Sequence, residues 1–268
     1  MSGPVALGYV RGMSDLPEAA AIWKLTPPAS SRGFGRTDVW IFDLDNTLYP
    51  ASCNLFAQID HRMGEFIQRY LGVSYAQARH LQKSYYRQFG TTLSGLMKIH
   101  HLEPAEYLDY VHDIDLSVVQ PSPALGRAID GLAGRKLIFT NGSRRHAENV
   151  AGKLGILDRF EDICDIAACD YVPKPDAEAF DRMLRLHAID PAGAAMFEDM
   201  PHNLEAPHVL GMTTVLVHSD YMDHPVQLAM KRWTSLPDHI HHATEDLTAF
   251  LERLPAALGE AQRGASQS

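Results

Sequence analysis

Five short apolar runs alternate along the chain with segments that have helical periodicity. Nearly continuous apolar strands that alternate with helices are typical of a parallel sheet covered on both faces. The pattern therefore predicts an α/β fold with a doubly wound, Rossmann-like parallel sheet. The apolar runs are DVWIFDL (38–44), RKLIFT (135–140), CDIAAC (164–169), AAMFE (194–198) and TTVLVH (213–218).

The alternation is interrupted once, from about Tyr49 to about Pro121, by helical pattern without a strand candidate. LFAQIDHRMGEFIQRYLG has apolar residues at helical spacing and Gly72 as a stop. SYAQARHLQKSYYRQFG begins with Ser74 as an N-cap and ends at Gly90. This insertion is far longer than an ordinary connection in an α/β unit. We therefore expect a small inserted helical cap over the carboxyl edge of the sheet, after the first strand.

These patterns divide the chain into four parts. Residues 1–37 have no sustained period and are predicted to be an extension that is flexible or draped over the domain. Residues 38–49 and 120–250 form the predicted core, and residues 50–119 the cap. Residues 251–268 are predicted to be a C-terminal tail.

Composition limits the partners and the compartment. The formal net charge of -9 argues against a nucleic acid or an anionic membrane as partner, but allows a small anion in a local basic pocket. The three cysteines are widely spread and form no CxxC pair, which argues against a disulfide framework and favours a reducing compartment. Without a signal-like start or an apolar run of membrane length, a cytoplasmic protein is expected. The oligomeric state stays open.

Polar residues follow four of the five predicted strands. In open parallel sheets the ligand crevice lies beyond the carboxyl ends of the strands. Asp43 and Asp45, two residues apart, would share one side of an extended segment and face that crevice. As an alternative, Asp45 and Asn46 are turn residues after a buried strand. The residues at the other strand ends are Thr140, Asn141 and Gly142, then Lys174, then Glu198 and Asp199.

Convergence of so many carboxylates at one edge requires a cation, and oxygen ligands of this kind suit Mg²⁺. Lys174, together with the hydroxyl and backbone donors of Thr140, Asn141 and Gly142, would complete a positive cradle for a small phosphate. Each residue also has an ordinary structural alternative. Lys174 is then a solvated loop lysine, Thr140 a strand-end β-former, and the two acids favourable charges at a helix N-terminus.

DLDNTLYP, FTNGS, KPD and FEDMPHNLEAPHVLGM follow one another along the chain. In this order they resemble the four motifs of the haloacid dehalogenase-like (HAD) superfamily of phosphohydrolases, over roughly Asp38 to His218. DLDNTLYP with a short helical cap looks most like the pyrimidine 5′-nucleotidase branch. The resemblance implies a Mg²⁺-dependent phosphoric monoester hydrolase.

The resemblance also assigns roles. Asp43 would attack phosphorus and form an aspartyl-phosphate. Asp45 would protonate the leaving alkoxide and then deprotonate the hydrolytic water. For the first task Asp45 must carry a proton at neutral pH, which the neighbouring charge of Asp43 would favour. Thr140 and Lys174 would hold the phosphoryl oxygens. The implied metal ligands are the Asp43 carboxylate, the Asp45 carbonyl and Asp199, with Glu198 direct or through water.

Specificity in the resemblance comes from the cap and from the stretch after the first motif, here roughly Tyr49 to Arg62. The candidates for contact with a base are Asn54, Phe56, Gln58 and His61, each with a helix-surface or core role as the alternative. The expected substrate is a small phosphorylated metabolite, first a uridine or cytidine monophosphate. Small sugar phosphates or phosphoglycolate are the alternatives. A phosphomutase would share every core residue.

Other readings fit the sequence less well. A dehalogenase needs neither a metal nor a proton donor, so Asp45 and the acidic pair argue against it. A response-regulator receiver is about half this length and has no helical insertion. The histidines at 239, 241 and 242 could form a second metal site. The simpler interpretation is an edge segment before a helix capped by Thr244. Arg144, Arg145 and His146 begin the helix after the second strand and could touch a substrate, but a solvated helix face is the expected place for them.

Overall fold

The computed structural model describes residues 22–219 and 225–255 of the chain. Within these residues one parallel sheet has the strand order β3-β2-β1-β4-β5-β6. Its winding reverses between β1 and β4, as in a doubly wound fold. The predicted α/β architecture is confirmed. The strands are β1 (Val39–Phe42), β2 (Arg135–Phe139), β3 (Asp162–Cys164), β4 (Ala194–Glu198), β5 (Thr213–Val217) and β6 (His242–Thr244).

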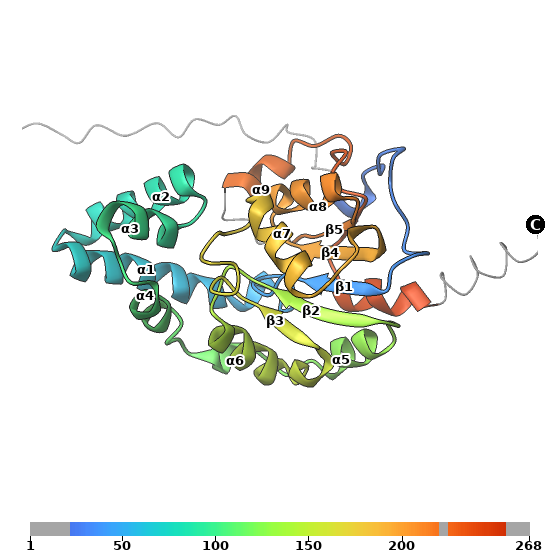
Figure 1. Ribbon diagram of the computed structural model, residues 1–268, viewed down its shortest axis with the longest axis horizontal. Coiled ribbons are helices and arrows are strands. Elements are labelled where there is room, and N and C mark those ends of the chain that lie inside the picture. Colours follow the sequence, from blue (N-terminus) through green and yellow to red (C-terminus); the bar gives the residue numbers. More distant parts are fainter. Residues whose placement is uncertain (1–21, 220–224, 256–268) are drawn as a thin grey trace, which may run out of the picture.

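Helices cover both faces of the sheet, because alternate residues of each strand point to opposite sides. Trp40 and Phe42 pack in one hydrophobic cluster with α5, α6 and the helix over 247–255. Val39 and Ile41 pack in a second cluster with α7, α8 and α9 on the other face, as Figure 1 shows. The helices are α5 (Pro123–Asp130), α6 (Arg144–Leu154), α7 (Ala177–Leu186), α8 (Glu205–Leu210) and α9 (Pro225–Met230).

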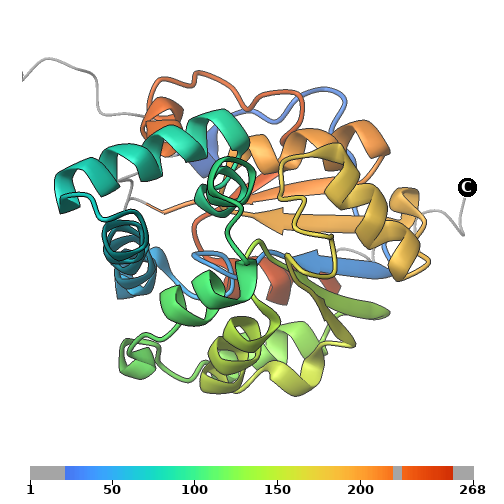
Figure 2. The same ribbon diagram turned by 60° about the vertical axis from the view of Figure 1, so that its left-hand side comes forward.

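The insertion after β1 is a helical cap with its own hydrophobic cluster, and it lies beyond the carboxyl ends of the strands (Figures 1 and 2). Ser74 caps its second helix in a reciprocal capping box with Gln77, and the first helix ends at Gly72 with a φ of 64°. Both predicted helix boundaries are therefore confirmed. The cap helices are α1 (Leu55–Leu71), α2 (Tyr75–Phe89), α3 (Thr92–His100) and α4 (Pro104–Val111).

The third strand lies earlier than predicted, since β3 ends at Cys164, the first residue of CDIAAC. The next residue, Asp165, turns the chain instead: its carboxylate accepts from the Arg144 N–H at 2.8 Å and from the Ala168 N–H at 3.0 Å. The apolar run was misleading because Ile166 and Cys169 are buried in a turn rather than in a ladder. Short 3₁₀ helices occur at Ile22–Lys24, Ala51–Cys53, Leu116–Val118, Leu157–Arg159, Pro191–Gly193 and Pro201–Leu204.

The described ends of the chain pack on the core. Ile22, Leu25 and Phe34 of the predicted extension are buried, so residues 22–37 are draped over the domain. Residues 251–255, assigned to the tail, continue a helix whose Leu251 and Leu254 are buried. Residues 1–21 and 256–268 lie outside the described part. None of the helices within that part is long and apolar enough to cross a bilayer.

Candidate active site

Strand register brings the first and fourth motifs together. Phe42 pairs with Phe197 across β1 and β4, so the next residues, Asp43 and Glu198, leave the sheet side by side. The Asp43 N–H continues the ladder by donating to the Phe197 carbonyl at 2.9 Å. Because parallel strands end at one edge, neighbouring strands present their terminal side chains to the same crevice.

Lys174 is the buried cation of this edge. Its Nζ donates to Asp43 Oδ1 at 2.6 Å, to Glu198 Oε1 at 2.9 Å and to the Phe139 carbonyl at 2.9 Å. Although burial alone would lower the pKa of Lys174, the charges of Asp43 and Glu198 raise it above its usual range. Lys174 is therefore a charged partner inside the site rather than a solvated loop lysine.

The loop after β2 positions both Lys174 and the predicted phosphate donors. The Asn141 side chain donates to the Lys174 carbonyl at 3.1 Å and accepts from its N–H at 2.9 Å. Thr140 is buried, and its hydroxyl accepts from the Gly142 N–H at 2.9 Å. Asn141 thus fixes the loop that carries the lysine, while Thr140 and Gly142 stand beside it at the strand end.

One oxygen each of Asp43, Glu198 and Asp199 lies within 4.8 Å of the others, and all three residues are buried. Burial and then the charge of Glu198 raise the pKa of Asp43 to about 8. The same two causes, in the same order, raise the pKa of Asp199 well above its usual range. Lys174 offsets one of the three negative charges, and a divalent cation would offset the other two. The oxygen donor set suits Mg²⁺.

Both oxygens of Glu198 accept protein hydrogen bonds. Oε1 accepts from Lys174 and from Asn203 Nδ2 at 2.6 Å, and Oε2 accepts from the Met200 N–H at 2.8 Å. Burial works against its ionisation, but Lys174 and these donors hold its pKa below the usual range. These contacts hold Glu198 as a carboxylate inside the acid cluster.

Asp45 lies in a separate environment from Asp43. Its Oδ1 accepts from the Tyr49 hydroxyl at 2.6 Å and lies 2.9 Å from His146 Nε2. Burial raises the pKa of Asp45, but the charge and hydrogen bond of His146 and the hydrogen bond of Tyr49 outweigh burial and lower it overall. The sequence analysis expected a protonated Asp45 from the charge of Asp43. That expectation missed these two donors, which favour the carboxylate.

The cap closes one side of the crevice. Burial, followed by the charges of Glu198 and Asp199, raises the pKa of Tyr86 on α2 to about 12. The turn after α2 approaches the loop of the third motif, since a Cβ on Gly90 would lie 3.6 Å from Pro173 Cγ. The cap therefore contacts the same loop that carries Lys174.

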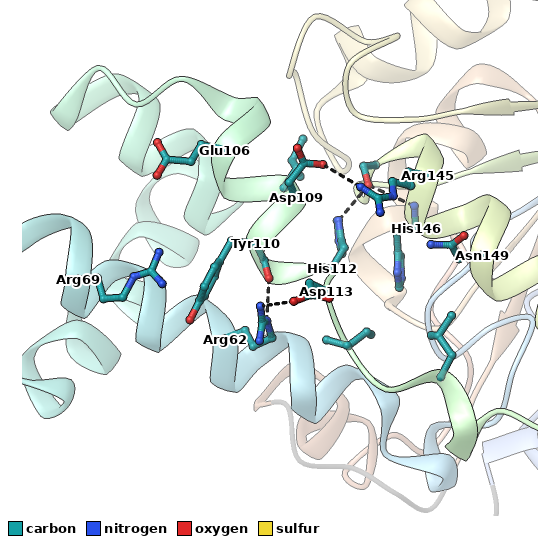
Figure 3. A pocket seen from close by; sticks show the side chains of 14 residues that line it. Arg62, Arg69, Glu106, Asp109, Tyr110, His112, Asp113, Arg145, His146 and Asn149 are labelled. Atoms are coloured by element: carbon teal, nitrogen blue, oxygen red, sulfur yellow. Dashed lines mark hydrogen bonds and ion pairs between the residues drawn. The ribbon is translucent and has the colours of Figure 1, made fainter.

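A pocket of about 450 Å³ opens on the other side, between α4 of the cap and α6 of the core (Figure 3). Ser143, one residue after the Thr140–Gly142 loop, lines it together with His112 and His146. Arg62 and Arg69 both lie 4.3 Å from the centre of the Tyr110 ring, on the cap side of the pocket. The pocket thus extends from the neighbourhood of Asp45 to polar side chains of the cap.

The four substrate candidates lie elsewhere on the cap. Gln58 exchanges two hydrogen bonds of 3.0 Å with the backbone of Asp115. His61 lies 2.8 Å from the Tyr75 hydroxyl and 3.3 Å from Glu65. Asn54 precedes α1 with a φ of 59°, and Phe56 is 40% exposed. None of the four lines the pocket described above.

The histidine segment joins the edge strand β6 to its neighbour β5. The Thr214 N–H and hydroxyl both lie 3.0 Å from His241 Nδ1, and His242 Nε2 lies 2.7 Å from the Arg32 carbonyl. β6 is the expected edge segment. The following helix is capped by Asp246, which accepts from the Ala249 N–H at 2.9 Å, while Thr244 accepts from the Asp246 N–H.

Sequence reasoning missed several residues of the site. His146 was expected on a solvated face but is buried against Asp45. Its position three residues after the N-cap Ser143 was the available signal, because the first turn of a helix after a parallel strand faces the crevice. Asn203 could have been found from its place five residues after Glu198. Nothing in the sequence pointed to Tyr49, Tyr86 or His112.

Comparison with known proteins agrees with this geometry. A family model described as haloacid dehalogenase-like hydrolase matches residues 37–211, which is more than half of the chain. Phosphate metabolism protein 8 of Saccharomyces cerevisiae is 28% identical over 199 residues, covering 66% of this chain and 60% of that protein. The match thus spans about three fifths of that relative's length.

Solved structures show the same fold. The HAD-hydrolase YfnB of Bacillus subtilis is 16% identical with a TM-score of 0.50, covering 83% of this chain and 99% of that one. The L-2-haloacid dehalogenase PA0810 is 12% identical with a TM-score of 0.50, covering 81% and 99%. With the motif residues gathered at one sheet edge and the family match across them, the chain belongs to the haloacid dehalogenase-like hydrolases.

Proposed function

We propose that the protein is a Mg²⁺-dependent phosphomonoester hydrolase that works through an aspartyl-phosphate on Asp43. The carrying observation is that the two aspartates of DLDNTLYP lie in different environments. Asp43 is held by Lys174 beside two further acids, whereas Asp45 is held by Tyr49 and His146. This difference supports a nucleophilic role for Asp43 and a proton-transfer role for Asp45.

Asp43 attacks phosphorus with the oxygen that Lys174 does not hold. The ammonium group offsets the repulsion between this carboxylate and the phosphate, and Thr140 and the Gly142 N–H, which bond to each other in the free site, would hold the phosphoryl oxygens. Asp43, Asp199 and the Asp45 carbonyl would hold Mg²⁺, with Glu198 direct or through water. When bound, the ion supplies charge stabilisation to the phosphoryl group.

Asp45 is the group that donates and later accepts a proton in the proposed reaction. Its hydrogen bonds favour the carboxylate before substrate binds. The negative charge of an arriving phosphate raises the pKa of a neighbouring carboxyl, so Asp45 takes up its proton with the substrate. It then protonates the leaving alkoxide and later accepts a proton from the hydrolytic water. A dehalogenase would need no such proton donor, because a halide leaves unprotonated.

The proposed substrate is a nucleoside 5′-monophosphate, with a pyrimidine base as first choice. The resemblance of DLDNTLYP and the short cap to the pyrimidine 5′-nucleotidases supports this proposal. The pocket of about 450 Å³, which His146 lines, also supports it, because it has the size of sites for small organic ligands and is lined from both cap and core. The name of the yeast relative, a phosphate metabolism protein, is consistent with phosphate chemistry.

Phosphate release with Mg²⁺ tests the proposal on uridine, cytidine and purine monophosphates, small sugar phosphates and phosphoglycolate. We expect the pyrimidine nucleotides to give the highest kcat/KM. A preference for sugar phosphates or phosphoglycolate would replace the nucleotidase assignment. Formation of an isomer without phosphate would indicate a phosphomutase. Failure to turn over any phosphomonoester would overturn the proposal.

Replacement of the nucleophile should abolish turnover without unfolding the protein. We expect Asp43→Asn to lower kcat at least about 1,000-fold, because an amide cannot form the aspartyl-phosphate. Its thermal unfolding temperature should not fall, since the pKa of about 8 shows that Asp43 is strained as an anion in the metal-free site. Asp181→Asn, an exposed residue of α7, is the control. Retained turnover in Asp43→Asn would rule out the mechanism.

Removal of divalent metal should stop the reaction reversibly. Dialysis against EDTA is expected to abolish phosphate release, and added Mg²⁺ should restore it, because Lys174 alone leaves the acid cluster with excess negative charge. Full activity in chelator would refute the proposed magnesium requirement while leaving the aspartyl-phosphate open to test by Asp43→Asn.

A further inference from the structure

Within the described residues, two side chains contact the same carboxylate oxygen of Asp45. Tyr49 and His146 both contact Oδ1, at 2.6 Å and 2.9 Å. The Tyr49 and His146 side chains are each 1% exposed, whereas the Asp45 side chain is 18% exposed. Oδ1 therefore faces the protein interior, and Oδ2 is the oxygen left for the crevice.

The imidazole of His146 is itself held in place. It stacks on His112, with ring centres 4.3 Å apart and planes inclined by 12°. The Ser143 hydroxyl lies 3.0 Å from His112 Nδ1 and accepts from the His146 N–H at 3.3 Å, which links the two residues a second time. Gly142 closes the space, since a Cβ there would lie 3.3 Å from His146 Cδ2.

These contacts join three distant parts of the chain. Tyr49 lies between β1 and the cap, His112 directly follows the last cap helix, and His146 lies in the first turn of α6. Figure 3 shows His112 and His146 side by side at the core end of the pocket. A buried arrangement of this kind restricts the rotation of the Asp45 carboxylate, and preorganised geometry is what proton transfer requires.

We propose that Tyr49 and His146 are positioning residues that reserve Oδ2 of Asp45 for proton transfer, with His112 holding the His146 ring. The inference rests on the proposed phosphomonoester hydrolysis. As the Asp43 O–P bond forms and the substrate O–P bond breaks, Oδ2–H gives its proton to the leaving alkoxide. When water attacks, Oδ2 takes a proton from it as the Asp43 O–P bond breaks. Tyr49, whose pKa is raised well above its usual value by burial and then by the charge of Asp45, keeps its proton throughout.

The proposal predicts that the loss of kcat/KM in the variants depends on the leaving group of the substrate. An alkoxide leaves slowly unless it is protonated, whereas p-nitrophenolate leaves without a proton. The ratio kcat/KM reports steps up to leaving-group departure. Loss of Asp45 positioning should therefore lower kcat/KM for an alkyl phosphate much more than for p-nitrophenyl phosphate. Water attack also needs Asp45, so the aspartyl-phosphate should accumulate with the aryl substrate.

The first test uses His146→Phe, which keeps an aromatic ring for the stack but removes the donor. With the alkyl phosphate that the wild type hydrolyses best, we expect kcat/KM to fall about 100-fold. With p-nitrophenyl phosphate we expect less than about a fivefold change in kcat/KM, and a burst of p-nitrophenol close to one per enzyme. Glu148→Gln, an exposed residue of the same helix, is the control.

If His146→Phe folds poorly, two further variants still test the positioning role. Tyr49→Phe removes the other donor without changing the packing and should show the same selective loss. His146→Gln retains an N–H near the position of Nε2 and should recover part of the alkyl activity. A structural role alone would lower kcat/KM equally for both substrates in every variant.

His112 is tested through its effect on His146. His112→Ala should show the same leaving-group pattern more weakly, and it should add nothing in the His146→Phe background, because the two then act through one contact. Equal losses for alkyl and aryl substrates, without a burst, would overturn the positioning role while wild-type hydrolysis still supports the proposed function. Absence of phosphate release by the wild type would overturn the function itself.

Discussion

Lys174 shows how one residue joins the stability of the site to its chemistry. Its ammonium group is almost completely buried and contacts Asp43, Glu198 and a backbone carbonyl. A buried ion pair of this kind contributes little net stability, but removal of one partner leaves an uncompensated buried charge. Lys174, which holds the proposed nucleophile, is therefore also a residue whose loss should strongly destabilise the fold.

Lys174→Met should destabilise the metal-free protein in a pH-dependent way. We expect the free energy of unfolding to fall by about 3 kcal/mol near pH 8. Without the lysine, the folded-state pKa of Asp43 rises further above its unfolded value, so the penalty applies to the ionised form and shrinks as pH falls. Urea denaturation in EDTA near pH 8 and near pH 5.5 measures the difference.

The control for this variant is Lys153→Met, an exposed lysine on α6, which should change stability little at either pH. An equal loss at both pH values in Lys174→Met would show that packing, and not the uncompensated acids, causes the destabilisation.

At the scale of elements, the cap depends on one close helix contact. A Cβ on Gly95 of α3 would lie 2.4 Å from Cβ of Tyr85 on α2, which is closer than side-chain atoms can approach. The backbones of α2 and α3 pack at this point because glycine leaves room. A larger residue must push the two helices apart.

We expect Gly95→Ala to lower the free energy of unfolding by about 1 to 3 kcal/mol through overpacking. The matched control is Gly152→Ala in α6, where a Cβ has nothing within 4 Å. Because alanine favours a helix more than glycine does, this control should stabilise by about 0.5 to 1 kcal/mol. Chemical denaturation of both variants gives the comparison, and the same sign for both would contradict the packing argument.

His241 ties β6 to β5 as a neutral acceptor. Burial and then the charge of Arg32 lower its pKa to about 4. A histidine with a depressed folded pKa contributes stability that is full above about 6.5 and is lost as pH falls toward 4. His241→Asn keeps an acceptor near the position of Nδ1 but cannot titrate.

We expect the wild type to lose about 1 to 2 kcal/mol more than His241→Asn between about pH 7.5 and pH 5, measured by urea denaturation. His80→Asn, an exposed histidine on α2, should behave like the wild type. The same pH slope in His241→Asn and the wild type would exclude the buried imidazole as the cause.

The sequence predicted the elements whose positions depend on local pattern. The strand ends that carry Asp43, Thr140 and Glu198 could be placed together because all parallel strands end at one edge. The turn at 165–169 could not be predicted, because most of its side chains are as apolar as those of a strand. Tyr49 and His112 could not be found either, because their contacts with the site depend on how the cap returns to the core.

For the whole molecule, the structure divides into a cap and a core with separate hydrophobic clusters. The chain crosses between them twice, before α1 and after α4. Gln58 bonds to the backbone of Asp115 and so links α1 to the second crossing. Substrate binding between the two parts is expected to draw them together. The cytoplasmic location expected from the sequence stays a prediction.

Hydrogen exchange should detect this closure. With Mg²⁺ and orthovanadate, a phosphate mimic, we expect amides of residues 112–119 and of the end of α2 to exchange more slowly, while amides inside β1 stay unchanged. Orthovanadate without Mg²⁺ is the control. Unchanged exchange in both regions, under conditions where vanadate inhibits the enzyme, would show that the cap does not move on binding.

The two crossings have a consequence for how such an enzyme can diversify. The outgoing crossing carries Tyr49 and the returning one carries His112, and both converge on Asp45 through the contacts described above. Asp45, the proposed proton-transfer group, thus lies beside both crossings, where a movement of the cap should displace it least. Parts of the cap farther from the two crossings, including most of α2 and α3, can be redesigned for a new leaving group while the residues around Asp45 stay unchanged.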